Sequence, residues 1–83
     1  MKLEDKTIKF KSNPEYYEKE ESGLKPNTVR KMDDWTSERR QKCRDAEFIK
    51  IVNTETGKHF IRKITDKTYM INLVIISWKS KSK

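Results

Sequence analysis

Eight consecutive residues place three chemically useful side chains at fixed intervals. The run from Gly23 to Arg30 reads Gly-Leu-Lys-Pro-Asn-Thr-Val-Arg and fits the pattern G-x-K-x-x-T-x-R. On an extended backbone Thr28 and Arg30 share one face, while Val29 points the other way, toward apolar neighbours. Arg30 could hold a phosphate, carboxylate or base edge with paired donors, Lys25 would add a movable positive charge, and Thr28 one hydrogen bond. We predict a pocket for a nucleotide-like ligand or RNA, with these ligand-binding residues: Gly23, Lys25, Asn27, Thr28 and Arg30.

The same side chains have two other interpretations. In the structural one, Arg30 pairs with Asp33 or Asp34, Lys25 is solvated and Thr28 simply suits a strand. In the catalytic one, Thr28 is a nucleophile and Lys25 its base, which requires burial or adjacent cations to deprotonate the amine near neutral pH.

The elements that must position this motif are a strand and a helix before it and a strand within it. Thr7 to Lys11 alternates apolar and polar residues, as a half-buried strand does. Asn13 can cap a helix that starts with Pro14, and Gly23 suits its left-handed C-terminal cap. The apolar stripe of this helix is narrow, so packing against the rest of the fold must stabilise it. After Pro26, a second strand should begin near Thr28.

The segment from Asp33 to Asp45 is densely charged. Thr36 or Ser37 could start a short helix there, although a mobile insertion is the alternative. Basic side chains beside an aromatic ring are typical of surfaces that bind single-stranded nucleic acids. In the alternative interpretation, Trp35 packs onto the core and the charged side chains are only solvated. The predicted nucleic-acid surface consists of Trp35, Arg39, Arg40, Lys42 and Arg44.

Three antiparallel strands are predicted to complete the fold. Ala46 to Asn53 and Lys58 to Ile64 should form a hairpin around the turn residues Asn53 to Gly57. A turn or bulge is expected at Thr65 to Lys67. The most apolar segment, Tyr69 to Trp78, is predicted to be a central strand buried on both faces.

Composition limits the class of protein. The chain has 83 residues and a net charge of +7, which attracts phosphates, acidic proteins or anionic surfaces. We expect one domain over residues 1–78 and a disordered basic tail over 79–83. A lone Cys43, no apolar leader and no long apolar run predict a cytoplasmic, non-membrane, monomeric protein. Cys43 and the lone His59 have no companions at metal-ligand spacing, so we expect no metal and no cofactor.

The motif between a short helix and a strand resembles the signature of ASCH-domain proteins, and Val74 to Trp78 resembles their closing strand. The resemblance covers most of Thr7 to Trp78 and includes short phage and Firmicute proteins. It implies an α+β fold: a small PUA/ASCH-like, mostly antiparallel β-barrel with one or two short helices, associated with RNA recognition. Some members are amidohydrolases on acetylated cytidine, whose motif Lys and Thr, here Lys25 and Thr28, act with a Glu from a later helical segment. Thr65 to Met70 leaves no room for such a helix.

Three functions therefore remain open. The first is a binding module for RNA or a modified nucleotide, supported by the motif and the charge. The second is a minimal amidohydrolase using Lys25 and Thr28. The third is a small phage-borne interaction protein whose basic face blocks a host protein complex, since function depends on surfaces carried by a fold.

Overall fold

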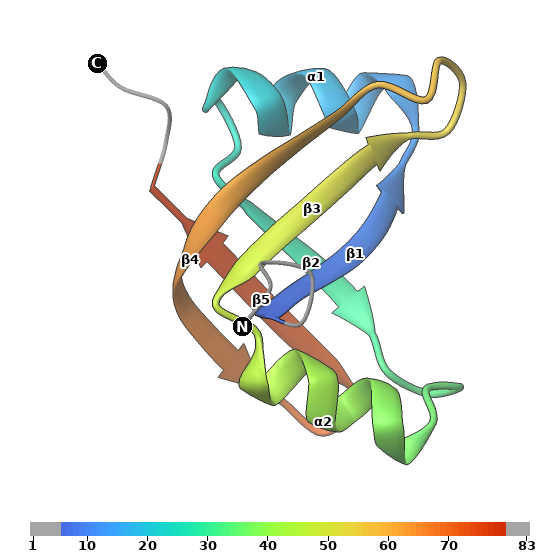
Figure 1. Cartoon of the computed structure of the whole chain (residues 1–83), viewed down its shortest axis with the longest axis vertical. Coiled ribbons are helices and arrows are strands. Elements are labelled where there is room, and N and C mark those ends of the chain that lie inside the picture. Colours follow the sequence, from blue (N-terminus) through green and yellow to red (C-terminus); the bar gives the residue numbers. More distant parts are fainter. Residues whose placement is uncertain (1–5, 80–83) are drawn as a thin grey trace.

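The computed structural model describes residues 6–79, which form five strands and two helices. Figure 1 shows their arrangement, an α+β fold as predicted. In chain order the elements are β1 (Thr7–Ser12), α1 (Pro14–Ser22), β2 (Asn27–Lys31), α2 (Ser37–Asp45), β3 (Phe48–Asn53), β4 (His59–Tyr69) and β5 (Leu73–Trp78). Of the predicted tail, residues 80–83 lie outside the described residues.

The five strands form a single curled sheet, a half-barrel, in the order β1-β3-β4-β5-β2. The pairs β3–β4, β4–β5 and β5–β2 are antiparallel, whereas β1 and β3 are parallel. The long strand β4 pairs with β3 through its first half and with β5 through its second half, and the register shifts between Ile64 and Asp66. A β-bulge bends its strand, so this irregularity lets β4 turn the sheet around the core.

Alternation along the strands builds the core on the inner face of the sheet. Ile8, Ile49 and Ile51 are fully buried, as are Val74 and Ile76 of β5. A group of aromatic rings fills the remaining space, with ring centroids 5.4 Å apart for Tyr17–Phe60 and 6.0 Å for Phe60–Trp78. The helices α1 and α2 lie at opposite ends of the sheet (Figure 1).

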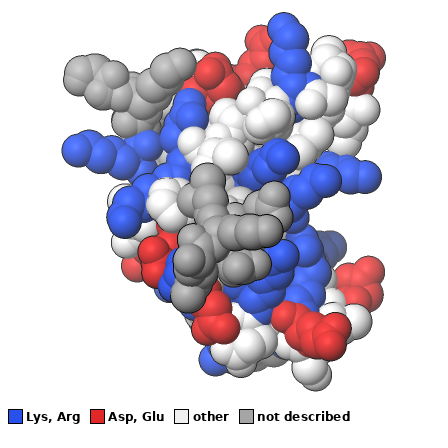
Figure 2. All heavy atoms as spheres, in the orientation of Figure 1, with Lys and Arg blue, Asp and Glu red and all other residues white. Residues whose placement is uncertain are grey.

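The outer face of β1, β3 and β4 carries lysines. Lys9 pairs in register with Lys50, and Thr7 pairs with Phe48, which pairs with Lys63. In Figure 2 basic side chains gather across the middle of this face, and acidic ones lie nearer the ends that carry α1 and α2. Within residues 6–79, no helix is long and apolar enough to cross a membrane.

The predicted helix ends are confirmed. The side chain of Asn13 accepts a hydrogen bond from the Tyr16 amide, and Gly23 ends the helix at φ 92°, a conformation that favours glycine. The Asp33 to Asp45 segment takes the helical alternative, because the Thr36 hydroxyl accepts a bond from the Arg39 amide and starts α2. Asn53 likewise organises the predicted turn by accepting bonds from the amides of Glu55 and Thr56.

The prediction for the last strand is wrong in two respects. Tyr69 ends β4, and β5 begins only at Leu73. Only one face of β5 is fully buried, because Val74, Ile76 and Trp78 alternate with partly exposed residues. The apolar residues between the two strands form an exposed hairpin tip, where Ile71 is 93% exposed. Of the alternatives for Thr65 to Lys67, the bulge within β4 is the one that occurs.

Candidate functional site

The motif occupies the connection from α1 to β2 and the start of that strand. The amide of Lys25 donates to the carbonyl of Lys19 in the last turns of α1, and the amide of Trp78 donates to the carbonyl of Pro26. The loop is therefore fixed at one end to the helix and at the other to β5. Backbone hydrogen bonds of this kind hold the loop without using the motif side chains.

Three of the predicted ligand-binding side chains line one cavity of about 480 Å³. Lys25, Thr28 and Arg30 share its wall with residues of β1, α1 and β2: Lys11, Ser12, Asn13, Tyr16, Glu20 and Val29. Gly23 and Asn27 do not line it in the described part of the chain. Instead Gly23 ends α1, and the Asn27 carbonyl accepts a 2.9 Å hydrogen bond from Lys25 Nζ.

Alternation on β2 holds as predicted. Thr28 pairs in register with the buried Ile76, and Arg30 pairs with the buried Val74, so both point to the inner face. Val29 points the opposite way and pairs in register with the apolar Ile75. Solvent nevertheless reaches half of the Val29 side chain, which is 50% exposed.

Arg30 connects the two edge strands of the half-barrel. Its Nη1 donates to the Lys11 carbonyl at 2.8 Å, and its Nη2 donates to Ser12 Oγ at 2.8 Å. Its Nε donates to Thr28 Oγ1 at 2.9 Å, which gives the buried threonine hydroxyl a partner. Within residues 6–79 the guanidinium bonds to Thr28, Lys11 and Ser12 and pairs with neither Asp33 nor Asp34, which disfavours the interpretation of Arg30 as a simple surface ion pair.

Glu20 is the site residue that sequence reasoning missed. Its side chain is 2% exposed, and its carboxylate accepts a 2.9 Å hydrogen bond from Ser12 Oγ and lies 3.5 Å from Lys25 Nζ. The available signal was helical spacing, because Glu20 lies three residues after the buried Tyr17 and so shares its face. A buried carboxylate needs such partners, since an uncompensated charge inside a protein is costly.

The cavity is lined by three cationic side chains, Lys11, Lys25 and Arg30, and by one carboxylate, that of Glu20. Burial lowers the pKa of Arg30 from its ordinary value, with the nearby Glu20 acting in the opposite direction and Arg39 adding to the decrease. The guanidinium is thus partly desolvated beside a second positive group. Lys25 Nζ also lies 5.9 Å from the centre of the Tyr16 ring, at the edge of the cavity.

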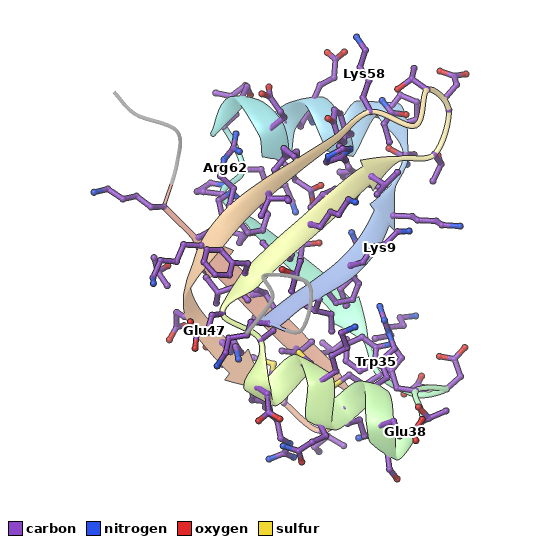
Figure 3. All side chains as sticks on the ribbon, in the orientation of Figure 1. Lys9, Trp35, Glu38, Glu47, Lys58 and Arg62 are labelled. Carbon is purple, nitrogen blue, oxygen red and sulfur yellow. The ribbon has the colours of Figure 1, made fainter. Side chains whose placement is uncertain are left out.

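The structure divides the predicted nucleic-acid surface into separate places. Trp35 packs against the core, its ring stacked 5.8 Å from that of Phe10, and lies between β1 and α2 in Figure 3. Arg39 lies over both rings. Arg40 donates to the Met32 carbonyl, Arg44 lies over Tyr69, and Lys42 is exposed. Trp35 and Arg39 are therefore brought together, and Arg44 is not part of that group.

The remaining reactive side chains do not form a site. Cys43 lies on the buried face of α2, where its Sγ accepts a hydrogen bond from the Tyr69 hydroxyl at 3.6 Å. His59 is exposed at the start of β4. Among residues 6–79, no group of three or more His, Cys, Asp or Glu side chains is placed to hold a metal ion.

Comparisons with known proteins give no match. No protein-family model matches the chain, and neither a curated protein nor a solved structure is significantly similar to it. The geometry of the site is therefore the basis for assigning a function.

Proposed function

We propose that this chain is a small binding module for a nucleotide-like ligand or RNA, held in the cavity that Lys25, Thr28 and Arg30 line. One observation carries the proposal: these three motif side chains converge on a cavity of about 480 Å³ together with the buried carboxylate of Glu20. Ligand pockets of proteins have volumes of roughly 300–1,000 Å³ and contain a few convergent polar groups. The net charge of +7 favours a phosphate-bearing ligand.

The polar groups of the cavity suit a nucleobase better than a simple anion. Lys25 and Arg30 supply donors, and the buried Glu20 carboxylate, whose oxygens already meet Ser12 Oγ and Lys25 Nζ, makes the wall behind them negative. A ligand with both donors and acceptors on one edge is complementary to this mixture of charges. The Tyr16 ring, which is half-exposed at the cavity, offers an apolar face on which a base could stack. A small inorganic anion would use the cations but would be repelled by the carboxylate.

The finer fold assignment and the partners belong to the same proposal. The curled sheet and the position of the motif between α1 and β2 support a PUA/ASCH-like barrel. We also propose that the protein acts in the cytoplasm with RNA or a nucleotide as its partner, which the unpaired Cys43 supports because reducing compartments keep thiols free.

The test is ligand capture by NMR. The stripped protein is titrated with RNA, DNA and modified nucleosides at two salt concentrations, and backbone shifts are followed. We expect shifts centred on Lys25, Thr28 and Arg30 that Lys25→Ala abolishes. The matched control is Lys31→Ala, which removes the same charge from an exposed neighbour on β2 outside the cavity. A folded protein that shows no shifts at these residues, or equal losses in both variants, would refute the binding proposal.

A second function, a minimal amidohydrolase for acylated nucleosides, is favoured by one specific observation. The carboxylate expected from a later helix is absent there, but Glu20 of α1 lines the cavity with Lys25 and Thr28. The hydroxyl of Thr28 is held by Arg30 Nε at 2.9 Å, which positions it toward the cavity wall. Turnover of a panel of acylated nucleosides that Lys25→Ala abolishes and Lys31→Ala retains would support this function, and the absence of any product would exclude it.

A further inference from the structure

A second cavity adjoins the first one across Arg30. It has a volume of about 440 Å³ and is lined by Lys9, Phe10, Lys11, Arg30 and Arg39. Two of these residues, Lys11 and Arg30, also line the cavity that contains the motif. The two cavities are therefore neighbours, with Arg30 in the wall of each.

The two guanidinium groups of the second cavity are held in place by aromatic rings and backbone oxygens. The guanidinium carbons of Arg30 and Arg39 lie 4.8 Å and 5.0 Å from the centre of the Phe10 ring. Arg39 also lies 5.0 Å from the Trp35 ring, and its Nη2 donates to the Lys9 carbonyl at 2.8 Å. Stacking and one anchoring bond fix the plane of the Arg39 group, which limits the entropy lost when it binds a ligand.

Both arginines keep donors for a ligand. A guanidinium carries five N–H groups. Arg39 uses one of them for the Lys9 carbonyl, and Arg30 uses three for Thr28, Lys11 and Ser12, counted within the described part of the chain. The remaining N–H groups are available to an oxygen-rich anion in the adjoining space.

Among residues 6–79, no ion pair neutralises the charge of this cavity. The ion pairs found among residues 6–79 are Lys6–Glu47, Lys19–Glu15, Lys25–Glu20 and Arg62–Glu21, and none of them includes a residue of the second cavity. Four cationic side chains thus line a cavity that has no carboxylate among its described lining residues. Burial contributes most to the lowered pKa of Arg30, the nearby Glu20 carboxylate opposes the decrease, and the positive charge of Arg39 adds to it. A bound dianion would relieve this crowding of positive charge.

We propose that the second cavity binds the phosphate of the nucleotide whose base occupies the motif cavity, with Arg39 and Arg30 as its donors and Lys9 and Lys11 as nearby charges. This inference rests on the proposed function and extends it, because it assigns the ligand class as a phosphorylated nucleoside. The division of polar groups supports it: the carboxylate lies in the first cavity, and the second contains cations and an aromatic ring only. Figure 3 shows Lys9 on β1 and Trp35 between β1 and α2.

Paired affinity measurements test the proposal. Ribonucleosides, their 5′-monophosphates and dinucleoside monophosphates are titrated at one ionic strength into wild type, Arg39→Gln and Arg44→Gln. Both variants remove one positive charge from α2, but Arg44 lies over Tyr69 and away from the cavity, so it is the matched control. Comparing the mononucleotide with the dinucleotide distinguishes a free nucleotide from RNA as the source of the phosphate.

We expect the phosphate to raise the affinity of wild type about tenfold or more, as charge-assisted hydrogen bonds do. Arg39→Gln should abolish this gain without changing nucleoside affinity, whereas Arg44→Gln should preserve it. As a measurement independent of any variant, inorganic phosphate should shift the Trp35 indole and the Arg39 side-chain resonances of wild type.

The outcomes separate the two proposals. If nucleosides bind in the motif cavity but the phosphate adds no affinity, the inference is wrong and the proposed function stands. Equal losses in Arg39→Gln and Arg44→Gln would also overturn the inference, because a general positive field would then explain the gain. If neither nucleosides nor nucleotides bind, both proposals are wrong. Phosphate binding at Arg39 without any nucleoside binding would refute a nucleotide spanning both cavities.

Discussion

Replacing Arg30 by lysine should destabilise the protein strongly although the charge is kept. The guanidinium makes three hydrogen bonds, to Lys11, Ser12 and Thr28, and the first two connect β2 to the opposite edge strand β1. An ammonium group is a compact point charge without the planar fork, so Arg30→Lys can replace about one of these bonds. Two bonds to a charged donor are then lost.

The magnitude follows from the number of lost bonds. Hydrogen bonds to charged groups contribute about 1.5–3 kcal/mol each, so the expected loss is about 3 kcal/mol at the lower limit. For a domain of this size, that is a large part of a total stability on the order of 4–12 kcal/mol. The corresponding decrease in Tm is about 12–24 °C.

The assay is urea unfolding followed by tryptophan fluorescence, with Arg44→Lys as the control. Arg44 is exposed and its described contact is with the Tyr69 ring, 5.5 Å from the guanidinium carbon. The control should therefore stay within about 0.5 kcal/mol of wild type, as surface substitutions usually do. A loss below about 1 kcal/mol for Arg30→Lys, or one no larger than that of Arg44→Lys, would refute the role of Arg30 as the connection between the edge strands.

Two further predictions concern aromatic residues, the buried Trp78 and Tyr69, which is 40% exposed. Trp78 Nε1 is buried without a hydrogen-bond partner in the part of the chain that the structure describes. Trp78→Phe should therefore lower the free energy of unfolding in urea by less than about 1.5 kcal/mol, because no hydrogen bond is lost. Trp78→Ala should lower it by roughly 3–5 kcal/mol, because it leaves a cavity. Burial, followed by the hydrogen bond to Cys43, raises the pKa of Tyr69 to about 12 from an ordinary value of 10.0. The pKa of Tyr69 is higher in the folded than in the unfolded protein, so the contribution of its phenol to stability is complete below pH 10 and is lost as the pH rises toward 12. Wild type should therefore lose stability more steeply than Tyr69→Phe between about pH 10 and 12. Parallel pH curves for the two proteins would contradict this assignment.

Local signals in the sequence predicted the helices and the motif face well. Asn13, Thr36 and Gly23 act within one turn of backbone, so their capping roles do not depend on the rest of the fold. Alternation likewise predicted that Thr28 and Arg30 share a face. The apolar character of Ile71 led to a wrong prediction of a buried strand. Ile71 lies at a hairpin tip, where an apolar side chain can be exposed.

Contacts between distant segments could not be predicted in the same way. Glu20 is buried because Ser12 of β1 and Lys25 of the following loop both reach its carboxylate, and no local pattern indicates that meeting. The position of Arg39 over Phe10 depends on how α2 packs beside β1. The hydrogen bond from Arg39 to the Lys9 carbonyl spans 30 positions of the chain, so no local pattern predicts it. Such contacts depend on how strongly the sheet curls. The curl results from the packing of all core residues together, so no short segment of the sequence predicts it.

The dual position of Arg30 links the fold to the candidate site. Its bonds to Lys11 and Ser12 join the two edge strands, and the same side chain forms part of the wall of both cavities. Separation of β1 from β2 would therefore remove the wall between the cavities as well as the hydrogen bond from Arg30 to Ser12 Oγ. A ligand that contacts Arg30 from both sides binds only the joined arrangement, and a ligand specific for the native state stabilises it by mass action. The protein should accordingly gain the most stability from ligands that occupy both cavities together.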